Sequence, residues 1–384
     1  MPAVSIGFAP PVTLRGSIIL TLVAAGAACG GEAAQEGHWS VRDSAGVTII
    51  ETADLARLDT LAVVPATDAV RIGLADGDAP YLFTGIAGLT RLADGRIVVA
   101  DARTEEIRFF DAAGTFLTKA GGGGSGPGEF REIVLLRRFA GDSLLVVDQL
   151  GRRITILDSS GQLVRRSSLA ISGTVVGAFP EGALVIHESM GMSAVAQGVA
   201  DSRLRLVLMD RESEQVTAFP GAEYAMRMVN AALAAPDARE SDAGPVPEWA
   251  TGPDGLYYAA DPARLEVRVY AETGAVERIM RVTKPLANGW DGQLKPQIRG
   301  VSVDADGRTW TLIEAADESG GDKDRWVVFD ADGAARYEVS LPRVPLRPGS
   351  GPRIEFGSDY VLAASSDPDG VPVITFTPLE WNEK

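Results

Sequence analysis

The chain has 384 residues, 46% of them hydrophobic, which suffices for two average domains or one large all-β domain with a substantial core. Its formal net charge is -16, from 36 Lys and Arg against 52 Asp and Glu, and an acidic surface repels both nucleic-acid phosphates and anionic lipid. The 43 Gly and 22 Pro favour short strands joined by tight turns, and the single cysteine excludes an intrachain disulfide.

The N-terminal segment has the features of a secretory signal. Arg15 is the only charged residue before the apolar run Ser17–Ala28. That run of about a dozen residues is shorter than the roughly 20 that span a bilayer. A positive residue followed by an apolar region and small residues is typical of a signal. We therefore predict a signal peptide over residues 1–28 and an exported protein.

The run ends in small residues directly before Cys29, which resembles the lipobox of bacterial lipoproteins. That family prefers Leu three residues before the cysteine, where this chain has Gly26. The resemblance implies a diacylated Cys29, a flexible tether over residues 29–38, and a periplasmic or outer-surface protein whose only contact with the membrane is its anchor. The alternative is an ordinary signal peptide with a cysteine near its cut site.

An internal repeat follows. Residues 97–117 align without a gap to residues 144–164. The alignment pairs three turn residues, Asp101 with Asp148, Asp111 with Asp158 and Gly114 with Gly161. Asp accepts hydrogen bonds from the backbone that follows it, and Gly takes the positive φ that closes a hairpin. Both copies therefore predict an apolar strand, a polar turn, an alternating strand, an Asp-x-x-Gly turn and a further strand.

A second turn precedes an apolar strand in each of five units. It reads Asp94-Gly95, Gly141-Asp142, Glu181-Gly182, Asp254-Gly255 and Asp306-Gly307. Each unit is thus a predicted four-stranded antiparallel meander. A sixth unit, over residues 352–377, lacks its fourth strand, and the N-terminal segments 47–51 and 69–73 are candidates for it. We predict a six-bladed β-propeller over residues 39–384, with a ring closed by N- and C-terminal strands.

The first two units resemble the NHL repeat. The resemblance lies in residues 111–116, the Gly-rich stretch 121–130 that ends in Gly-Glu-Phe, and the pair Arg153-Ile154. The whole chain is similar to bacterial six-bladed propeller lipoproteins related to NHL proteins, which implies a fold and no single activity. A β-sandwich is the alternative fold. Residues 222–235 are the one tract with helical composition.

The connections of a meander alternate between two rims. The short Asp-Gly and Asp-x-x-Gly turns share one rim. The long insertions share the other, named here the long-loop rim, and they cover residues 120–130, 187–202, 221–247, 284–297 and 315–323. Because long loops usually carry binding, we expect the functional surface at the long-loop rim.

The first strand of each predicted blade lines the central channel and begins at that rim. Residues near these strand starts are Arg131, Glu132, Glu248, Trp249, Arg299 and Arg353. Since Arg pairs well with carboxylates, we predict that Arg131, Glu248, Trp249, Arg299 and Arg353 bind an anionic or sugar-like ligand. The alternative is that the arginines pair with nearby acids and Trp249 packs between blades.

We predict no catalytic or metal-binding set and no cofactor. His38 and His187 are too few for the histidine-held zinc of some NHL-like lyases, and no Gly-x-Ser-x-Gly motif occurs. Gluconolactonase-type propellers hold a metal with Glu, Asn and Asp, but no Asn falls on a predicted inner strand. The recurring Asp101, Asp148 and Asp261 are interpreted as caps of the turns that follow them, because an active site is built once.

The function predicted from sequence is therefore an exported, lipid-anchored module that binds a protein, peptide or glycan of the cell envelope, and no nucleic acid. One alternative is a channel-centred metal-dependent hydrolase or lactonase. Another is a structural subunit of an envelope complex.

Overall fold

The computed structural model describes residues 35–36, 38–60, 62–63, 69–169, 173–178, 184–195, 199–209, 216–229, 248–261, 264–284, 298–313, 323–342, 346–347, 351–367 and 369–381. All of them belong to one compact unit, Ala34–Lys384. The predicted signal peptide and Cys29 lie outside the described residues. No helix within the described ranges is long and apolar enough to cross a membrane.

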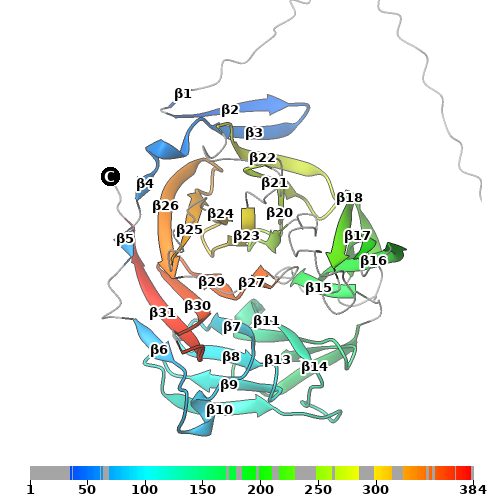
Figure 1. Cartoon of the computed structure of the whole chain (residues 1–384), viewed down its shortest axis with the longest axis vertical. Helices are drawn as coiled ribbons and strands as arrows, with labels where there is room; N and C mark the ends of the chain where they lie inside the picture. Colours follow the sequence, from blue (N-terminus) through cyan, green and yellow to red (C-terminus); the bar gives the residue numbers. More distant parts are fainter. Residues whose placement is uncertain are drawn as a thin grey trace, which may run out of the picture. The chain divides into compact units, whose positions relative to one another are not determined.

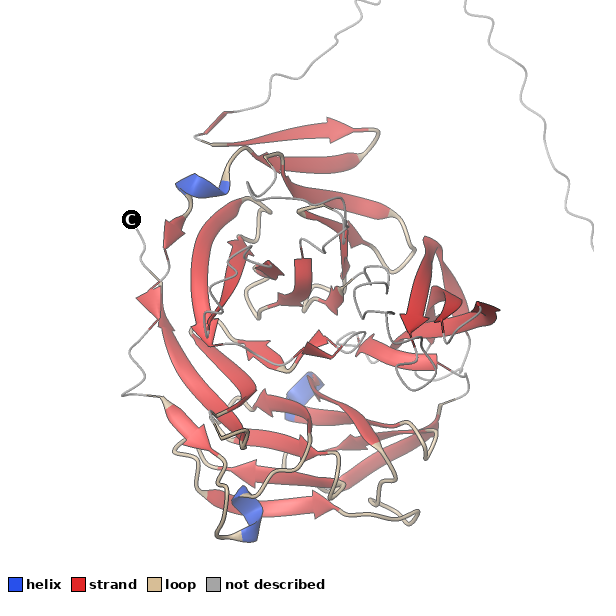
Figure 2. Ribbon diagram, viewed as in Figure 1, coloured by secondary structure: helices blue, strands red, loops and turns tan. Residues whose placement is uncertain are grey.

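Five four-stranded antiparallel meanders follow one another along the chain, as the repeat predicts (Figures 1 and 2). Blade 1 contains β7 (Ile86–Arg91), β8 (Ile97–Asp101), β9 (Glu106–Phe110) and β10 (Phe116–Gly121). Blade 2 contains β11 (Ile133–Phe139), β12 (Ser143–Asp148), β13 (Arg153–Leu157) and β14 (Leu163–Ser168). Blade 3 contains β15 (Gly173–Ala178), β16 (Leu184–Val195), β17 (Val199–Met209) and β18 (Val216–Val229).

Blades 4 and 5 have the same order. Blade 4 contains β19 (Trp249–Thr251), β20 (Tyr257–Asp261), β21 (Glu266–Tyr270) and β22 (Val276–Val282). Blade 5 contains β23 (Ile298–Val303), β24 (Thr309–Ile313), β25 (Lys323–Phe329) and β26 (Ala335–Pro342). β16, β17 and β18 of blade 3 are longer than the strands of blades 1, 2, 4 and 5.

The sixth sheet combines strands from both ends of the chain. β29 (Ile354–Phe356), β30 (Tyr360–Ser366) and β31 (Pro372–Glu380) form an antiparallel meander. β6 (Val70–Ile72) pairs antiparallel with β31, so this sheet takes its fourth strand from the N-terminal candidate 69–73. The pair β27 (Leu346–Arg347) and β28 (Gly351–Pro352) precedes this meander.

The other N-terminal candidate, residues 47–51, pairs elsewhere. β2 (Trp39–Ser44) and β3 (Val47–Thr52) form a hairpin, and β3 joins β22 in parallel. β1 (Gln35–Glu36) pairs with β2. The hairpin covers the outer edge of blade 4, where an unpaired strand would otherwise expose its backbone groups. Two further short strands, β4 (Asp59–Thr60) and β5 (Ala62–Val63), pair with β26 and β31.

The first strands of the six sheets contact one another in sequence, from β7 through β11, β15, β19 and β23 to β29, and β29 contacts β7. They therefore form a ring, and the core lies between neighbouring blades. One cluster joins Phe109 of blade 1 to Leu144 of blade 2, and another joins Trp326 of blade 5 to Phe356 of the sixth sheet. The indole of Trp310 stacks on Phe356 with ring centroids 4.0 Å apart.

The turns have the predicted chemistry. The Asp111 carboxylate accepts hydrogen bonds from the backbone N–H groups of Ala113 (2.9 Å) and Thr115 (2.8 Å), and Gly114 has a φ of 85°. Asp158 and Asp330 make equivalent bonds. The Asp304 carboxylate likewise accepts from the N–H groups of Asp306 and Arg308, so this Asp-rich stretch is a turn.

Two expectations about blade 3 were wrong. Residues 187–202, predicted as a loop, largely continue β16 and β17, which pair as far as Val195 and Val199. The tract 222–235, which has helical composition, forms strand as far as Val229, because β18 pairs with the extended β17. Tertiary pairing outweighs helix propensity here. Residues 230–247 lie outside the described part of the chain.

Candidate functional site

A cavity of about 420 Å³ lies within the ring of inner strands and reaches the long-loop rim. Its walls come from four sheets, namely blades 1, 2 and 3 and the sixth sheet, with β7 and β11 along its length. The rim contributes Thr84 and Gly85 before β7, Arg103 after β8, Glu132 before β11 and Arg353 before β29. Val134 and Val175 add apolar surface deeper in the cavity. The cavity thus opens where the sequence predicts binding.

Three arginines line this cavity, namely Arg103, Arg137 and Arg353. Within the described part of the chain, the guanidinium groups of Arg103 and Arg137 make no ion pair. The Arg137 side chain is in contact with solvent inside the ring. Desolvation by the surrounding protein lowers the pKa of its guanidinium, although the negative charge of Glu355 acts in the opposite direction. Glu132 is the one carboxylate in the lining. The cavity therefore presents more positive than negative charge on a protein whose net charge is -16.

Buried carboxylates hold the rim in place. The Asp148 side chain, fully buried at the end of β12, accepts hydrogen bonds from the backbone N–H groups of Arg131 (3.1 Å), Glu132 (3.0 Å) and Gly151 (2.8 Å). Asp101, also fully buried, accepts from Thr84 (3.1 Å) and Arg103 (2.9 Å) in the same way. These bonds support the interpretation of both residues as caps. Asp261, at the end of β20, is half-buried.

Arg153 explains the NHL-like motif in physical terms. Its guanidinium donates to the Asp148 carboxylate and to the carbonyls of Ser125 and Glu129, both at 3.1 Å. The arginine therefore ties the Gly-rich segment 121–130 to the end of β12, and Phe130 at the end of that segment is fully buried. The segment is an ordered connection between blades 1 and 2.

In blade 1, an arginine at a different position ties the rim to the buried aspartate. Glu106 occupies the position of Arg153, but Arg108, two residues further on the same strand face, donates to the carbonyl of Leu82 (2.8 Å) and lies 3.7 Å from Asp101. Between these two anchors, Glu105 has a left-handed φ of 56° and its carboxylate accepts from the Ile133 N–H (2.8 Å). Burial raises the pKa of the Glu105 carboxyl despite that bond, and the charges of Asp148 and Glu132 raise it further.

The predicted site residues fall into two groups. Arg353 lines the cavity and is half-buried. Arg131 lies at the rim with an exposed side chain, and it is not among the cavity residues.

Trp249 and Arg299 lie on the inner strands of blades 4 and 5, and Glu248 directly precedes β19. Burial raises the pKa of the Glu248 carboxyl to about 8, although the charge of Arg299 opposes this. Trp249 is buried, with 6% of its surface exposed. The structure does not bring these three residues into the described cavity, and their part in binding stays a prediction.

Sequence reasoning missed Arg103 and Arg137. Arg103 follows β8 in a short connection, whereas the sequence analysis considered only the residues at the starts of first strands. Arg137 lies at the fifth position of β11, whose pairing with β12 shifts register between Ile133 and Leu135. Side chains of a regular strand point alternately to its two faces, and the register shift interrupts this alternation. Simple counting along β11 therefore does not predict that Arg137 faces the cavity. Among the described residues, no group of three His, Cys, Asp or Glu side chains is placed to hold a metal ion.

The model of the DUF5128 family, described as a 6-bladed beta-propeller, matches residues 82–222. With six sheets around a ring of inner strands, the body of the chain is a six-bladed β-propeller of four-stranded antiparallel blades, which resembles the NHL-repeat proteins. No protein of curated function matches the sequence.

Several solved structures align with most of this chain. A member of the DUF4221 family from Bacteroides vulgatus aligns with a TM-score of 0.50 at 12% identity, over 83% of this chain and 98% of that one. A candidate exported protein from Bacteroides fragilis gives 0.49 at 11%, over 87% and 100%. A gluconolactonase from Xanthomonas campestris gives 0.44 at 16%, over 84% and 96%. At these identities the likeness concerns the fold alone.

Proposed function

We propose that this propeller is an exported, lipid-anchored binding module of the bacterial cell envelope, and that it binds an anionic peptide in the central cavity. One observation carries the proposal: Arg103, Arg137 and Arg353, from three different sheets, line one cavity at the long-loop rim. A guanidinium group pairs with a carboxylate through two parallel hydrogen bonds, so such a lining suits a ligand with several carboxylates.

The surroundings of the arginines strengthen the attraction. Like charges close together repel, and an enclosed site screens them less than open water does. A bound polyanion relieves that repulsion. The volume of about 420 Å³ falls within the roughly 300–1,000 Å³ that small-ligand pockets occupy, which is room for the end or a short segment of a peptide.

Export and anchoring rest on the N-terminal sequence. The apolar run 17–28 and the small residues before Cys29 support a cleaved signal and a diacylated cysteine. An acidic protein held at a membrane by a lipid would then present its rim to envelope partners. In this proposal the anchor is the only membrane contact, and nucleic acid is not a partner.

A binding measurement tests the proposal. Fluorescence anisotropy of a dye-labelled hexaglutamate peptide should report binding to the purified full chain, and a matched hexaglutamine peptide should not bind. Arg137→Gln should weaken the affinity about ten-fold or more, because one charged hydrogen-bonding group is lost.

Arg264→Gln is the matched control, because Arg264 is an exposed arginine that lines neither the central cavity nor the other described pocket. It should leave the affinity for hexaglutamate unchanged. Equal binding of both peptides, or equal loss with both variants, would contradict a specific site in the channel.

A further inference from the structure

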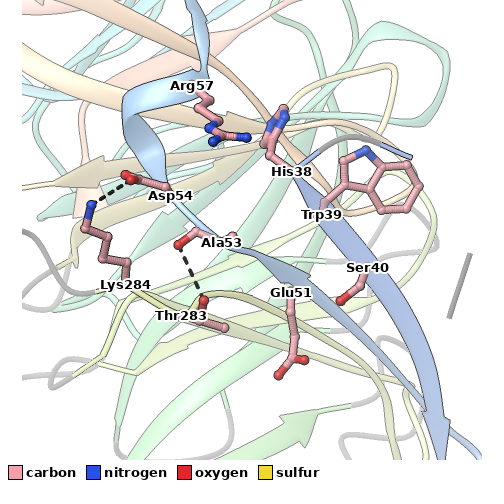
Figure 3. Close-up of a pocket in the computed structure, with 9 residues that line it drawn as sticks. All are labelled: His38, Trp39, Ser40, Glu51, Ala53, Asp54, Arg57, Thr283 and Lys284. Carbon is pink, nitrogen blue, oxygen red and sulfur yellow. Dashed lines mark hydrogen bonds and ion pairs between the residues drawn. The ribbon is translucent and has the colours of Figure 1, made fainter. Parts of the chain in front are cut away.

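A second pocket, of about 480 Å³, lies at the outer edge of blade 4 (Figure 3). Three segments distant in sequence build it: the start of β2, the end of β3 with the short helix η1 (Leu55–Arg57), and the residues that follow β22. The lining residues are His38, Trp39, Ser40, Glu51, Ala53, Asp54, Arg57, Thr283 and Lys284. None of them lines the central cavity.

Backbone bonds fix the relative positions of these segments. The Ala53 N–H donates to the His38 carbonyl (2.9 Å), and the Thr283 N–H donates to the Thr52 carbonyl (2.9 Å). The Asp54 side chain caps η1 by accepting from the Ala56 N–H (2.9 Å). The pocket is therefore formed by paired strands and a capped turn.

The acids of the pocket already have partners. Asp54 forms an ion pair with Lys284 (2.7 Å), drawn as a dashed line in Figure 3, and this bond holds the pKa of the Asp54 carboxyl below its ordinary value. Glu51 pairs with Arg281 and, at 3.7 Å, with Arg42. Each carboxylate keeps further lone pairs that can accept hydrogen bonds from a ligand.

Two nitrogen-bearing side chains of the pocket have no such partner. The His38 Nε2 atom is buried and forms no hydrogen bond with any residue that the structure describes. Arg57 has no ion pair to any residue in the described ranges. In Figure 3 both side chains lie at the same end of the pocket, and the Arg57 guanidinium is drawn toward the His38 imidazole. A buried polar atom without a partner costs about 1–3 kcal/mol, so its position calls for a ligand group.

We propose that this pocket binds an acidic sugar of the hexuronate type. Its carboxylate would accept hydrogen bonds from Arg57 and from His38 Nε2–H. Its hydroxyl groups would donate to the free lone pairs of Glu51 and Asp54. The sugar ring would lie against Trp39, whose indole is half-buried at the edge of the pocket.

The shape of the pocket supports a sugar more than a simple anion. An inorganic anion would satisfy Arg57 and His38, but it has no hydroxyl groups to donate to the remaining lone pairs of Glu51 and Asp54. A hexuronate carries one carboxylate and several hydroxyl groups on a compact ring, which matches a site with donors at one end and acceptors at the other. Trp39 is held in place by packing against the core and by Arg336, whose guanidinium carbon lies 5.2 Å from the ring centroid.

The chain offers an unusually direct test, because His38 and His187 are its only histidines. In the full chain purified without a histidine tag and labelled with 15N-histidine, NMR shows the imidazole signals of two residues. Titration with glucuronate should shift the His38 signal, which His38→Gln assigns by its disappearance, and should leave that of His187 in place. Neutral glucose and sodium acetate are the control ligands, and both should shift the His38 signal far less.

Variants separate the two sites of the molecule. Arg57→Gln should weaken glucuronate binding about ten-fold or more, because a charged hydrogen-bonding partner is lost. Arg103→Gln, in the central cavity, should leave the shift of the His38 signal by glucuronate unchanged, because Arg103 does not line this pocket. The proposal is overturned if glucuronate leaves the His38 signal unmoved, if acetate or glucose shifts it as strongly, or if Arg57→Gln binds like the wild type. This result is independent of hexaglutamate binding in the channel.

Discussion

Asp148 and Arg153 show how single residues build the long-loop rim. The aspartate is fully buried and the arginine is nearly so, with 10% of its side chain exposed. Burial alone would raise the pKa of the Asp148 carboxyl, but the hydrogen bonds from Arg153 and the backbone outweigh it and lower the pKa. The same pair positions the Gly-rich segment 121–130 and the backbone at Glu132, so one ion pair supports both the fold and the cavity.

Arg153→Ala should therefore destabilise the protein by about 3 kcal/mol, because it leaves a buried carboxylate without its charged partner. Arg138→Ala is the matched control. Arg138 forms an exposed ion pair with Asp142 at 2.7 Å, and its loss should cost less than about 1 kcal/mol. Denaturant unfolding gives both values. Equal losses in the two variants would contradict the role of Arg153.

Glu248 predicts a pH dependence of stability. Its folded pKa of about 8 lies above the ordinary value of 4.5, so between these values the folded state holds a proton that the unfolded state has released. The stability that the protonated Glu248 contributes is therefore fully present when the pH is below the ordinary pKa of 4.5. It is lost as the pH rises through the folded pKa of about 8.

Glu248→Gln should remove that slope and stabilise the protein above the folded pKa, by on the order of 3 kcal/mol. Thermal unfolding of both proteins across this pH range measures the difference. Parallel curves for wild type and variant would show that burial does not perturb Glu248.

Residue-level prediction from sequence succeeded where chemistry is local. Asp111, Asp158 and Asp330 cap their own turns, so their roles can be read from neighbouring residues. It failed where register decides which side chains face the channel, as at Arg137. The sequence analysis assigned His38 to a flexible tether. In the structure, His38 directly precedes β2, and the pairing of β2 with β3 brings it into the pocket that Arg57 also lines.

At the scale of elements, the second and third strands of each blade were the most predictable. The second strands are mostly apolar, as in β8, where every residue is buried. The third strands alternate, as in β21, and turns bound both kinds of strand. The parallel pairing of β3 with β22 joins segments more than two hundred residues apart in sequence, and no local pattern indicates it. The extended strands of blade 3 were missed because they contain residues typical of turns and loops, such as Gly191 and Pro220-Gly221.

Neighbouring inner strands approach closely at Gly88 on β7. A Cβ atom there would lie 2.8 Å from the Cβ of Leu136 on β11. Gly88→Ala should therefore cost about 1–3 kcal/mol through overpacking, and should disturb the cavity that both strands line.

Gly123→Ala is the control for this prediction, because a Cβ atom at Gly123 would meet no atom within 4 Å. Its stability should match the wild type. If Gly88→Ala is equally well tolerated, blades 1 and 2 are less tightly packed than described.

At the scale of the whole molecule, the fold was predictable because one unit recurs, and each unit buries its faces only against its neighbours. Contacts between β29 and β7 and pairing of β31 with β6 then join the two ends of the described unit. The ligand was not predictable to the same degree, because the sequences between the repeated strands differ from blade to blade.

The proposed anchor makes a prediction at this scale. Cys29→Ser should move the protein from the membrane fraction to the soluble fraction of its native host, because diacylation requires the thiol. Cell fractionation and immunoblotting measure the distribution, with an unmodified integral membrane protein as the fractionation control. Retention of the variant in the membrane fraction would rule out a lipid anchor.

The proposal that an anionic peptide binds in the central cavity is tested most directly by hydrogen–deuterium exchange of the full chain with and without hexaglutamate. We predict slower exchange in residues 84–89 and 132–137, which contain most of the residues that line the cavity, and unchanged exchange in the outer strands β10 and β14. Protection confined to the outer strands, or no protection at saturating peptide, would contradict it.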